Sequence, residues 1–428
     1  MPVYDQVVLP KLDSAALREA TGLNEFLMPS YTGFGLANLT PSIAHWLKAG
    51  ELPAPIMDKA ILENFQDHYQ NVVLILVDAL GYNQLVRLMN AGKAPLWQKQ
   101  LEKGKLFPLT SISPSTTASA LTTIWTGTAP NQHGVIGYEM WLKELGLIMN
   151  NILHTPITFK GDIGGLSRAG FEPTRFMNQI PLGQRFSKYG VESHAFLPAG
   201  IANSGLSMMH LPGSHLHAFT AESDMFLNMR DLLNAPSRQR RFVYGYWSYV
   251  DGLMHRYGTY DERVTEQFFD FSNAFFRLLV SGLTEQAKKD TLILVTADHG
   301  SVETPVDEHF NLANHPDFRK MLTMSPTCEG RLPFFYLKQG SESAVRPYFE
   351  HTWPGKFVLL TRQQVLDLKL LGNGQDHPDL EERIGDLVAI PRGNAYLWWP
   401  EKANTMQGRH GGLHPDEMLV PLFAVDLN

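Results

Sequence analysis

The sequence is poor in cysteine and has no excess of positive charge. Cys328 is the only cysteine among 428 residues, so no intrachain disulfide can form and a disulfide-stapled secreted scaffold is excluded. The 36 Lys and Arg residues are outnumbered by 43 Asp and Glu residues, for a formal net charge of −7. No long basic run is present, which disfavours a protein that coats a nucleic acid by neutralising successive phosphates.

Long hydrophobic runs are also absent. No uncharged apolar run reaches the ~18 residues that a membrane-spanning helix requires; the run 72–77 ends at Asp78. The N-terminus carries Asp5 and Lys11 where an export signal would need apolar residues. We therefore expect a cytoplasmic protein without membrane contact. The sequence leaves the oligomeric state open.

Three short apolar segments rich in β-branched residues predict buried strands at 71–77, 242–249 and 291–296. Candidate ligands follow the three segments: Asp78, Asp251, and the pair Asp298 and His299. In an open, mostly parallel sheet, ligands gather beyond the carboxyl ends of the strands. The sequence thus predicts an α/β fold with one shared site at that edge.

Two helices and one lobe are predicted around these strands. Thr259 and Glu262 resemble a capping box, followed by an apolar stripe at helical spacing: Val264, Phe268, Phe271, Phe275 and Leu278. A second helix begins near Thr117 and stops at Gly127. The region 340–400 is mixed in charge and rich in turn residues, which indicates an inserted lobe. No internal repeat is present, so we treat 1–428 as a single catalytic domain.

Carboxylates and histidines near the predicted strand ends suit a metal site. Asp251 and His255 are four residues apart, which places both on one side of a helix, and Gly300 lets the chain turn after the preceding Asp–His pair. Taken alone, Asp78 is as well explained by a turn and His255 by a surface position. Together the candidates have the composition of a site for two divalent ions about 4 Å apart: Asp78, Asp251, His255, Asp298, His299 and His410.

Five segments carry a resemblance to the alkaline phosphatase superfamily, within the branch of type I phosphodiesterases and nucleotide pyrophosphatases. They are 75–81 (ILVDALG), 113–137 (SPSTTASALTTIWTGTAPNQHGVIG), 250–258 (VDGLMHRYG), 295–301 (VTADHGS) and 409–422 (RHGGLHPDEMLVPL). The resemblance implies an alkaline-phosphatase-like α/β sandwich, with a large, mostly parallel central sheet flanked by helices and an inserted cap-like lobe near the active site.

The resemblance also implies roles for individual residues. One ion would be bound by Asp251, His255 and His410. The second would be bound by Asp78, Asp298, His299 and the oxygen of the nucleophile. Counting back ten residues from the glycine that closes the helix gives Thr117 as the nucleophile, with Thr116 as the competing choice.

The resemblance leaves His414 as an alternative to His410, and it assigns His133 to a structural turn. One departure concerns Ala120, because such diesterases commonly carry an asparagine three residues after the nucleophile. Zinc is the expected metal for this ligand set, and manganese is the alternative.

The expected function is metal-dependent hydrolysis of phosphodiester or pyrophosphate bonds through a phosphothreonine intermediate. The substrate would be a small phosphoester such as a nucleotide, whose base could stack on Trp125, Tyr138, Trp141 or Trp247. Rival activities are phosphomonoester and phosphonate hydrolysis; a sulfatase ranks lowest because the only cysteine lies outside the nucleophile motif. From a different class, a catalytically inactive metal-binding regulatory protein would also retain these ligands.

Overall fold

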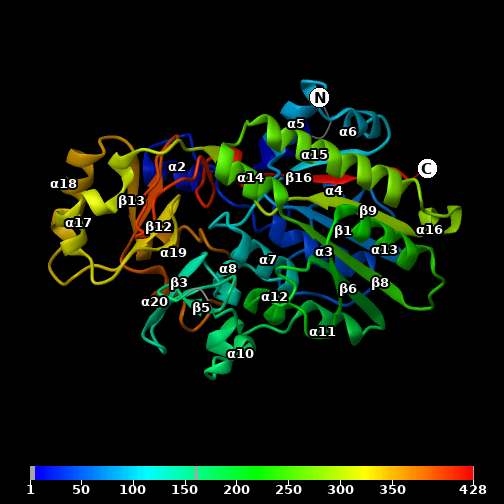
Figure 1. The fold of residues 1–428 in the computed structure, drawn as a ribbon, viewed down its shortest axis with the longest axis horizontal. Coiled ribbons are helices and arrows are strands. Elements are labelled where there is room, and N and C mark those ends of the chain that lie inside the picture. The colour runs from blue at the N-terminus through cyan, green and yellow to red at the C-terminus, as the bar shows by residue number, and fades with distance from the viewer. Residues whose placement is uncertain (1–4, 160–161, 428) are drawn as a thin grey trace.

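A seven-stranded, mostly parallel sheet lies at the centre of the protein (Figure 1). The computed structural model describes residues 5–159 and 162–427. In spatial order the strands are β2 (Lys105–Thr110), β16 (Leu419–Ala424), β9 (Thr291–Thr296), β1 (Asn71–Val77), β8 (Arg240–Trp247), β6 (Val191–Pro198) and β7 (His215–Phe219). Only β16 runs antiparallel to its neighbours. The predicted α/β class with a large, mostly parallel sheet is confirmed.

The three predicted strands lie side by side in this sheet. The bounds of β1 and β9 agree with the prediction, and both strands are buried along their whole length. Strand β8 starts and ends two residues earlier than predicted. Ser248 is instead the N-cap of helix α14 (Tyr249–Tyr257), which begins at Tyr249. The β-branched runs therefore predicted the strands well, and the error lies at one strand-to-helix junction.

Helices cover both faces of the central sheet, which explains why its strands are apolar on both sides. On one face, Trp125 of α7 (Thr117–Thr126) packs edge-on against Phe242 and Tyr244 of β8. On the other face, Trp247 of β8 packs against Phe271 of α15 (Glu262–Ala274), with ring centroids 4.4 Å apart. Because successive side chains of β8 point to opposite faces of the sheet, this strand contacts a helix on each face.

Helix α15 presents the predicted apolar stripe, but its start and end differ from the prediction. Its N-cap is Asp261, whose side chain accepts from the Arg263 amide, so the expected capping box is wrong. The Thr259 hydroxyl instead contacts the Ser301 hydroxyl at 3.2 Å. The chain then widens into a π-helical turn, Phe275–Val280, which shifts burial away from Leu278.

The remaining helices of five or more residues lie before, between and after these strands. They are α2 (Ala15–Thr21), α3 (Leu39–Trp46), α5 (Tyr82–Asn90), α6 (Pro95–Gln100), α10 (Pro173–Met177), α11 (Leu182–Ser187), α12 (Gly205–His210), α13 (Glu222–Asn234), α16 (Glu285–Lys289), α17 (Pro316–Met321), α18 (Glu342–Thr352), α19 (Arg362–Asp367) and α20 (Leu380–Ile384).

A second, antiparallel sheet forms the other end of the molecule, on the left of Figure 1. Its spatial order is β13 (Phe357–Thr361), β14 (Leu387–Pro391), β12 (Leu332–Phe335), β11 (Thr327–Glu329), β3 (Glu139–Leu142), β4 (Leu147–Asn150) and β5 (Thr155–Pro156). Segments far apart in sequence meet here, because β11 pairs with β3. The region 340–400 supplies the outer strands β13 and β14, and a core cluster rich in aromatic residues lies beside them.

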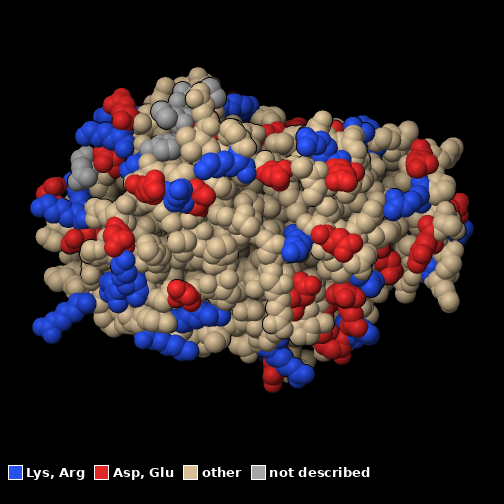
Figure 2. Space-filling model, turned by 180° about the vertical axis from the view of Figure 1, so that it is seen from behind, with Lys and Arg blue, Asp and Glu red and all other residues tan. Residues whose placement is uncertain are grey.

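A short ladder of β10 (Val302–Glu303) and β15 (Gly408–Arg409) brings the region around residue 410 to the end of the central sheet. On the face seen in Figure 2, charges of both signs are interspersed. Within residues 5–159 and 162–427, no helix has the length and apolar character needed to cross a bilayer.

Candidate active site

The candidate ligands converge beyond the carboxyl ends of three adjacent parallel strands. Asp78 follows β1, Asp298 and His299 follow β9, and Asp251 lies in the first turn of α14, after β8. One ligand atom each of Asp78, Asp298 and His299 lie within 4.8 Å of one another, and the same holds for Asp251, His299 and His410. The sheet therefore assembles residues that are up to 332 positions apart in the sequence into two adjoining ligand groups.

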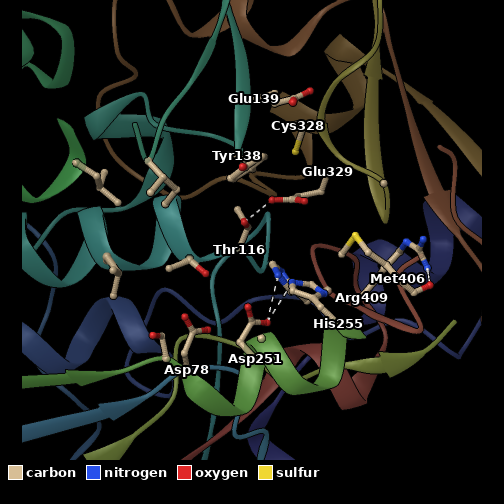
Figure 3. A pocket seen from close by; sticks show the side chains of 18 of the residues that line it. Asp78, Thr116, Tyr138, Glu139, Asp251, His255, Cys328, Glu329, Met406 and Arg409 are labelled. Carbon is tan, nitrogen blue, oxygen red and sulfur yellow. Dashed lines mark hydrogen bonds and ion pairs between the residues drawn. The ribbon is translucent and has the colours of Figure 1, made fainter. Parts of the chain in front are cut away.

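His255 lies beside the second group. Its Nε2 atom is 3.3 Å from Asp251 Oδ1, and its ring centroid is 5.2 Å from that of His410. The ring of His299 stacks on His410 with a centroid separation of 3.7 Å. His299 therefore lies between the two groups, whereas the sequence assigned it to one ion only. Figure 3 shows Asp251 and His255 on α14, facing the cavity near Asp78.

The three carboxylates fit divalent cations. Among the described residues, Asp78 Oδ1, Asp251 Oδ1 and Asp298 Oδ2 are buried oxygens without a hydrogen-bond donor. Their companion oxygens on two residues are occupied: Tyr246 donates to Asp78, and two backbone amides donate to Asp298 Oδ1. Buried carboxylate oxygens without partners are costly unless a cation or a proton accompanies them. One free oxygen on each carboxylate is what a ligand role requires.

The histidines are oriented for the same role. The Nδ1 atom of His255 lies 2.8 Å from the Gly408 carbonyl, that of His299 lies 2.9 Å from the Gly300 carbonyl, and that of His410 lies 3.1 Å from the Ser115 carbonyl. Because a carbonyl only accepts, each Nδ1 donates its proton to the backbone, and each Nε2 is left for other partners. Such backbone contacts are the usual means of fixing a metal-binding imidazole.

The pKa values of the buried acidic and basic groups also favour bound positive charge at the site. Burial, together with the nearby carboxylates of Asp298 and Asp251, raises the pKa of Asp78 well above its usual value. Burial, with His299 and His255 close by, lowers the pKa of His410 well below its usual value. A neutral His410 imidazole beside crowded carboxylates belongs to a set of donors whose negative charge divalent cations would balance.

The two candidate nucleophiles have different environments. Thr117 is the first residue of α7, and its hydroxyl oxygen lies 3.2 Å from His299 Nε2. Thr116 is the N-cap, and its hydroxyl donates to Glu329 on the opposite wall of the cavity. The geometry thus directs Thr117 toward the ligand groups and Thr116 away from them.

Two further histidines have structural partners. His414 is the N-cap of α21 (Pro415–Met418), and its Nδ1 accepts from the Asp416 amide. His133 accepts from the Val135 amide through Nδ1, so its Nε2 donates to the Thr123 hydroxyl at 3.0 Å. His133 therefore ends the short helix α8 (Pro130–His133) rather than lying in a turn, and His414 has a capping role.

A cavity of about 500 Å³ opens beside the ligand groups (Figure 3). The segments 138–209 and 397–409 both contribute to its walls. Its lining includes Tyr138, Ile152, Leu206, Tyr246, Cys328, Glu329, Trp398, Trp399 and Arg409. Of the four aromatic candidates, only Tyr138 is among the lining residues. Trp125 and Trp247 are instead buried in the core, so that part of the expectation is wrong.

The sequence analysis did not predict the residues of the cavity wall opposite Thr117. Ala120 is fully buried and is not among the residues described as lining the cavity. Glu329 does line the cavity, and burial raises its pKa to about 8. Trp398 and Trp399 could have been noted as adjacent tryptophans, whereas no sequence signal marks Glu329 as a neighbour of Thr116.

The family model of type I phosphodiesterases and nucleotide pyrophosphatases matches residues 72–413. The chain belongs to this family of phosphoric ester hydrolases, which is metal-dependent. The match spans all six candidate ligands and both threonines. No curated protein sequence matches the chain.

Two solved structures illustrate the shared fold. Murine ectonucleotide pyrophosphatase/phosphodiesterase 5, an inactive form in complex with AMP, is 15% identical with a TM-score of 0.61, covering 82% of this chain and 87% of that chain. Phosphonoacetate hydrolase from Sinorhizobium meliloti 1021, in complex with phosphonoacetate, is 17% identical with a TM-score of 0.59, covering 82% of this chain and 89% of that chain. The fold is thus alkaline-phosphatase-like.

Proposed function

We propose that the protein hydrolyses small phosphodiesters or pyrophosphates in two steps, through a phosphothreonine at Thr117. In the first step the Thr117 oxygen attacks phosphorus in line with the leaving oxygen, and the bond between phosphorus and the leaving group breaks. In the second step water attacks the phosphothreonine and restores the hydroxyl. The N-terminus of α7 favours both the alkoxide and the phosphate, because its amides and dipole are positive there.

The candidate ligands would hold two divalent ions, with zinc as the preferred metal and manganese as the alternative. Asp78, Asp298 and His299 lie on the Thr117 side, and Asp251, His255 and His410 line the adjoining side. Bound there, the ions would lower the pKa of the threonine hydroxyl and offset the charge of the phosphate. Tyr246 and the three backbone carbonyls keep the ligand side chains in place.

One observation carries the proposal: the Thr117 hydroxyl lies 3.2 Å from His299 Nε2, next to carboxylate oxygens that lack donors. The test is to quench turnover of bis(p-nitrophenyl) phosphate with acid and map the phosphorylated residue by mass spectrometry. Phosphate on Thr117 is expected. Phosphate on Thr116, or no phosphoprotein during rapid turnover, would contradict the mechanism.

Phosphonate hydrolysis is the second candidate, since a phosphonoacetate hydrolase shares the fold. A substrate panel with varied metals separates the candidates: bis(p-nitrophenyl) phosphate, p-nitrophenyl phosphate, a nucleotide thymidine ester, phosphonoacetate and a sulfate ester. We expect the highest kcat/KM for a diester. Tight zinc binding without turnover of any panel member would favour the regulatory alternative.

A further inference from the structure

Thr116 has the backbone of a helix cap but does not cap its helix. Its φ of −137° and ψ of 146° are those of an N-cap residue, and threonine is a preferred residue there. Yet its hydroxyl accepts no hydrogen bond from the first turn of α7. The hydroxyl donates instead to Oε1 of Glu329, which is 213 positions away in the sequence (Figure 3).

This arrangement leaves the first turn of α7 open. The first backbone bond of the helix runs from the Ala120 amide to the Thr116 carbonyl, at 3.0 Å. Within the described parts of the chain, no acceptor is recorded for the amides of Thr117, Ala118 and Ser119. Uncapped N–H groups at a helix N-terminus favour anions, and these lie beside the cavity that Thr117 lines.

Glu329 is itself held in place from behind. It ends strand β11, and Gly411, beside the candidate ligand His410, packs against it. A Cβ atom added to Gly411 would lie 2.6 Å from Glu329 Cβ, and the φ of Gly411 is +115°. Only glycine fits such a close approach at this φ. The carboxyl group is therefore fixed at the wall facing Thr116.

We infer that Glu329 is a positioning residue, which accepts the Thr116 hydroxyl and so keeps the first-turn amides of α7 open to an oxygen of the substrate phosphate. Without that acceptor, the hydroxyl would rotate to accept from the Ala118 or Ser119 amide, as threonine does at other N-caps. The hydroxyl would then compete with the phosphate for the same donors. The inference rests on the proposed function at Thr117.

The experiment compares Glu329→Ala with the double variant Glu329→Ala/Thr116→Val, each loaded with zinc. The readouts are kcat/KM for bis(p-nitrophenyl) phosphate and the Kd of inorganic phosphate measured by calorimetry. Glu329→Ala should lower kcat/KM by about 10²-fold, as for loss of one oxyanion donor, and weaken phosphate binding. Adding Thr116→Val removes the competing hydroxyl. The double variant should therefore have a kcat/KM and a phosphate affinity at least about tenfold higher than those of Glu329→Ala.

A merely structural role for Glu329 predicts no rescue, so a double variant no better than Glu329→Ala would overturn the inference. Glu329→Gln, which can still accept the hydroxyl, should lose far less than Glu329→Ala; an equal loss would also overturn it. If Glu329→Ala fails to fold, Glu329→Met of similar length replaces it in the same comparison.

Metal content is measured in every variant. A loss of phosphate affinity that follows a loss of zinc would overturn the inference, because Glu329 would then act through the loop of His410. Failure of the proposed function is separable from this result. If no phosphothreonine forms at Thr117, the mechanism fails, whereas the phosphate Kd of the paired variants still reports on Glu329.

Discussion

The two sheets supply different parts of the candidate site. The parallel sheet ends in Asp78, Asp298 and His299, which follow directly from the geometry of adjacent strands. The antiparallel sheet supplies the facing wall, with Glu329 at the end of β11. We expect the ligands beside the parallel sheet to serve the reaction itself, and the facing wall to position the phosphate through Glu329 and to fit the leaving group through its aromatic residues. Variants of the ligands and of Glu329 should then affect all substrates alike, whereas variants of the aromatic residues should discriminate among substrates.

The largest effect is expected at the nucleophile. Thr117→Ala should lower kcat by about 10⁴-fold or more on every substrate, because losing the covalent step exceeds the ~10²–10³ cost of one oxyanion donor. Thr117→Ser should keep measurable activity. Steady-state kinetics on a diester and a monoester measures the loss; near-normal rates in Thr117→Ala would contradict the assignment.

Removal of a candidate ligand should come next. Asp298→Ala removes a carboxylate from one ligand group and should lower zinc content from two ions toward one, with activity reduced by on the order of 10³-fold. Elemental analysis and thermal melting check this variant. A full complement of zinc, or a globally unfolded protein, would count against a pure ligand role.

A smaller effect is expected in acid, at a buried histidine beside the second sheet. His154, between β4 and β5, is buried with both ring nitrogens unpartnered, and burial lowers its pKa to about 4. In the unfolded chain His154 takes up a proton near pH 6.5, whereas in the folded protein it does so only near pH 4. For this group the free energy of unfolding is therefore highest above pH 6.5 and decreases as the pH drops toward 4. The slope is at most about 1.4 kcal/mol per pH unit for this group.

His154→Phe keeps a ring between Phe171 and Phe176 and removes the titrating group. Urea unfolding at several pH values should then show a shallower decline between pH 6.5 and 4 than in the unmodified protein. An unchanged slope would assign the acid sensitivity to other groups.

The smallest effect is expected on the cavity wall. Trp399→Ala should raise KM about 3- to 10-fold for diesters with aryl groups, with kcat little changed, because an indole contributes stacking of about 1 kcal/mol. A substrate with small alkyl groups is the matched control and should be affected less. An equal change in kcat on all substrates would contradict a stacking role for Trp399.

The sequence could predict the residues of the parallel sheet because each lies next to the run that forms its strand. Asp78 directly follows the buried apolar run 72–77, and the same logic locates Asp298. Glu329 could not be predicted, since β11 has three residues and no periodic pattern. Its contact with Thr116 depends on how the two sheets pack together, which no local signal encodes. The sequence also could not show that His299 is shared by the two ligand groups, because this placement depends on how distant segments pack together.

The position of β16 has a consequence for biosynthesis. This strand, residues 419–424, lies between β9 and β2 and is antiparallel to both. While a ribosome is still translating the codons before it, one edge of β9 is unpaired and β2 has no partner strand, and exposed edges invite pairing with other chains. The nascent polypeptide therefore has to remain unaggregated until residues 419–424 have been translated and can pair.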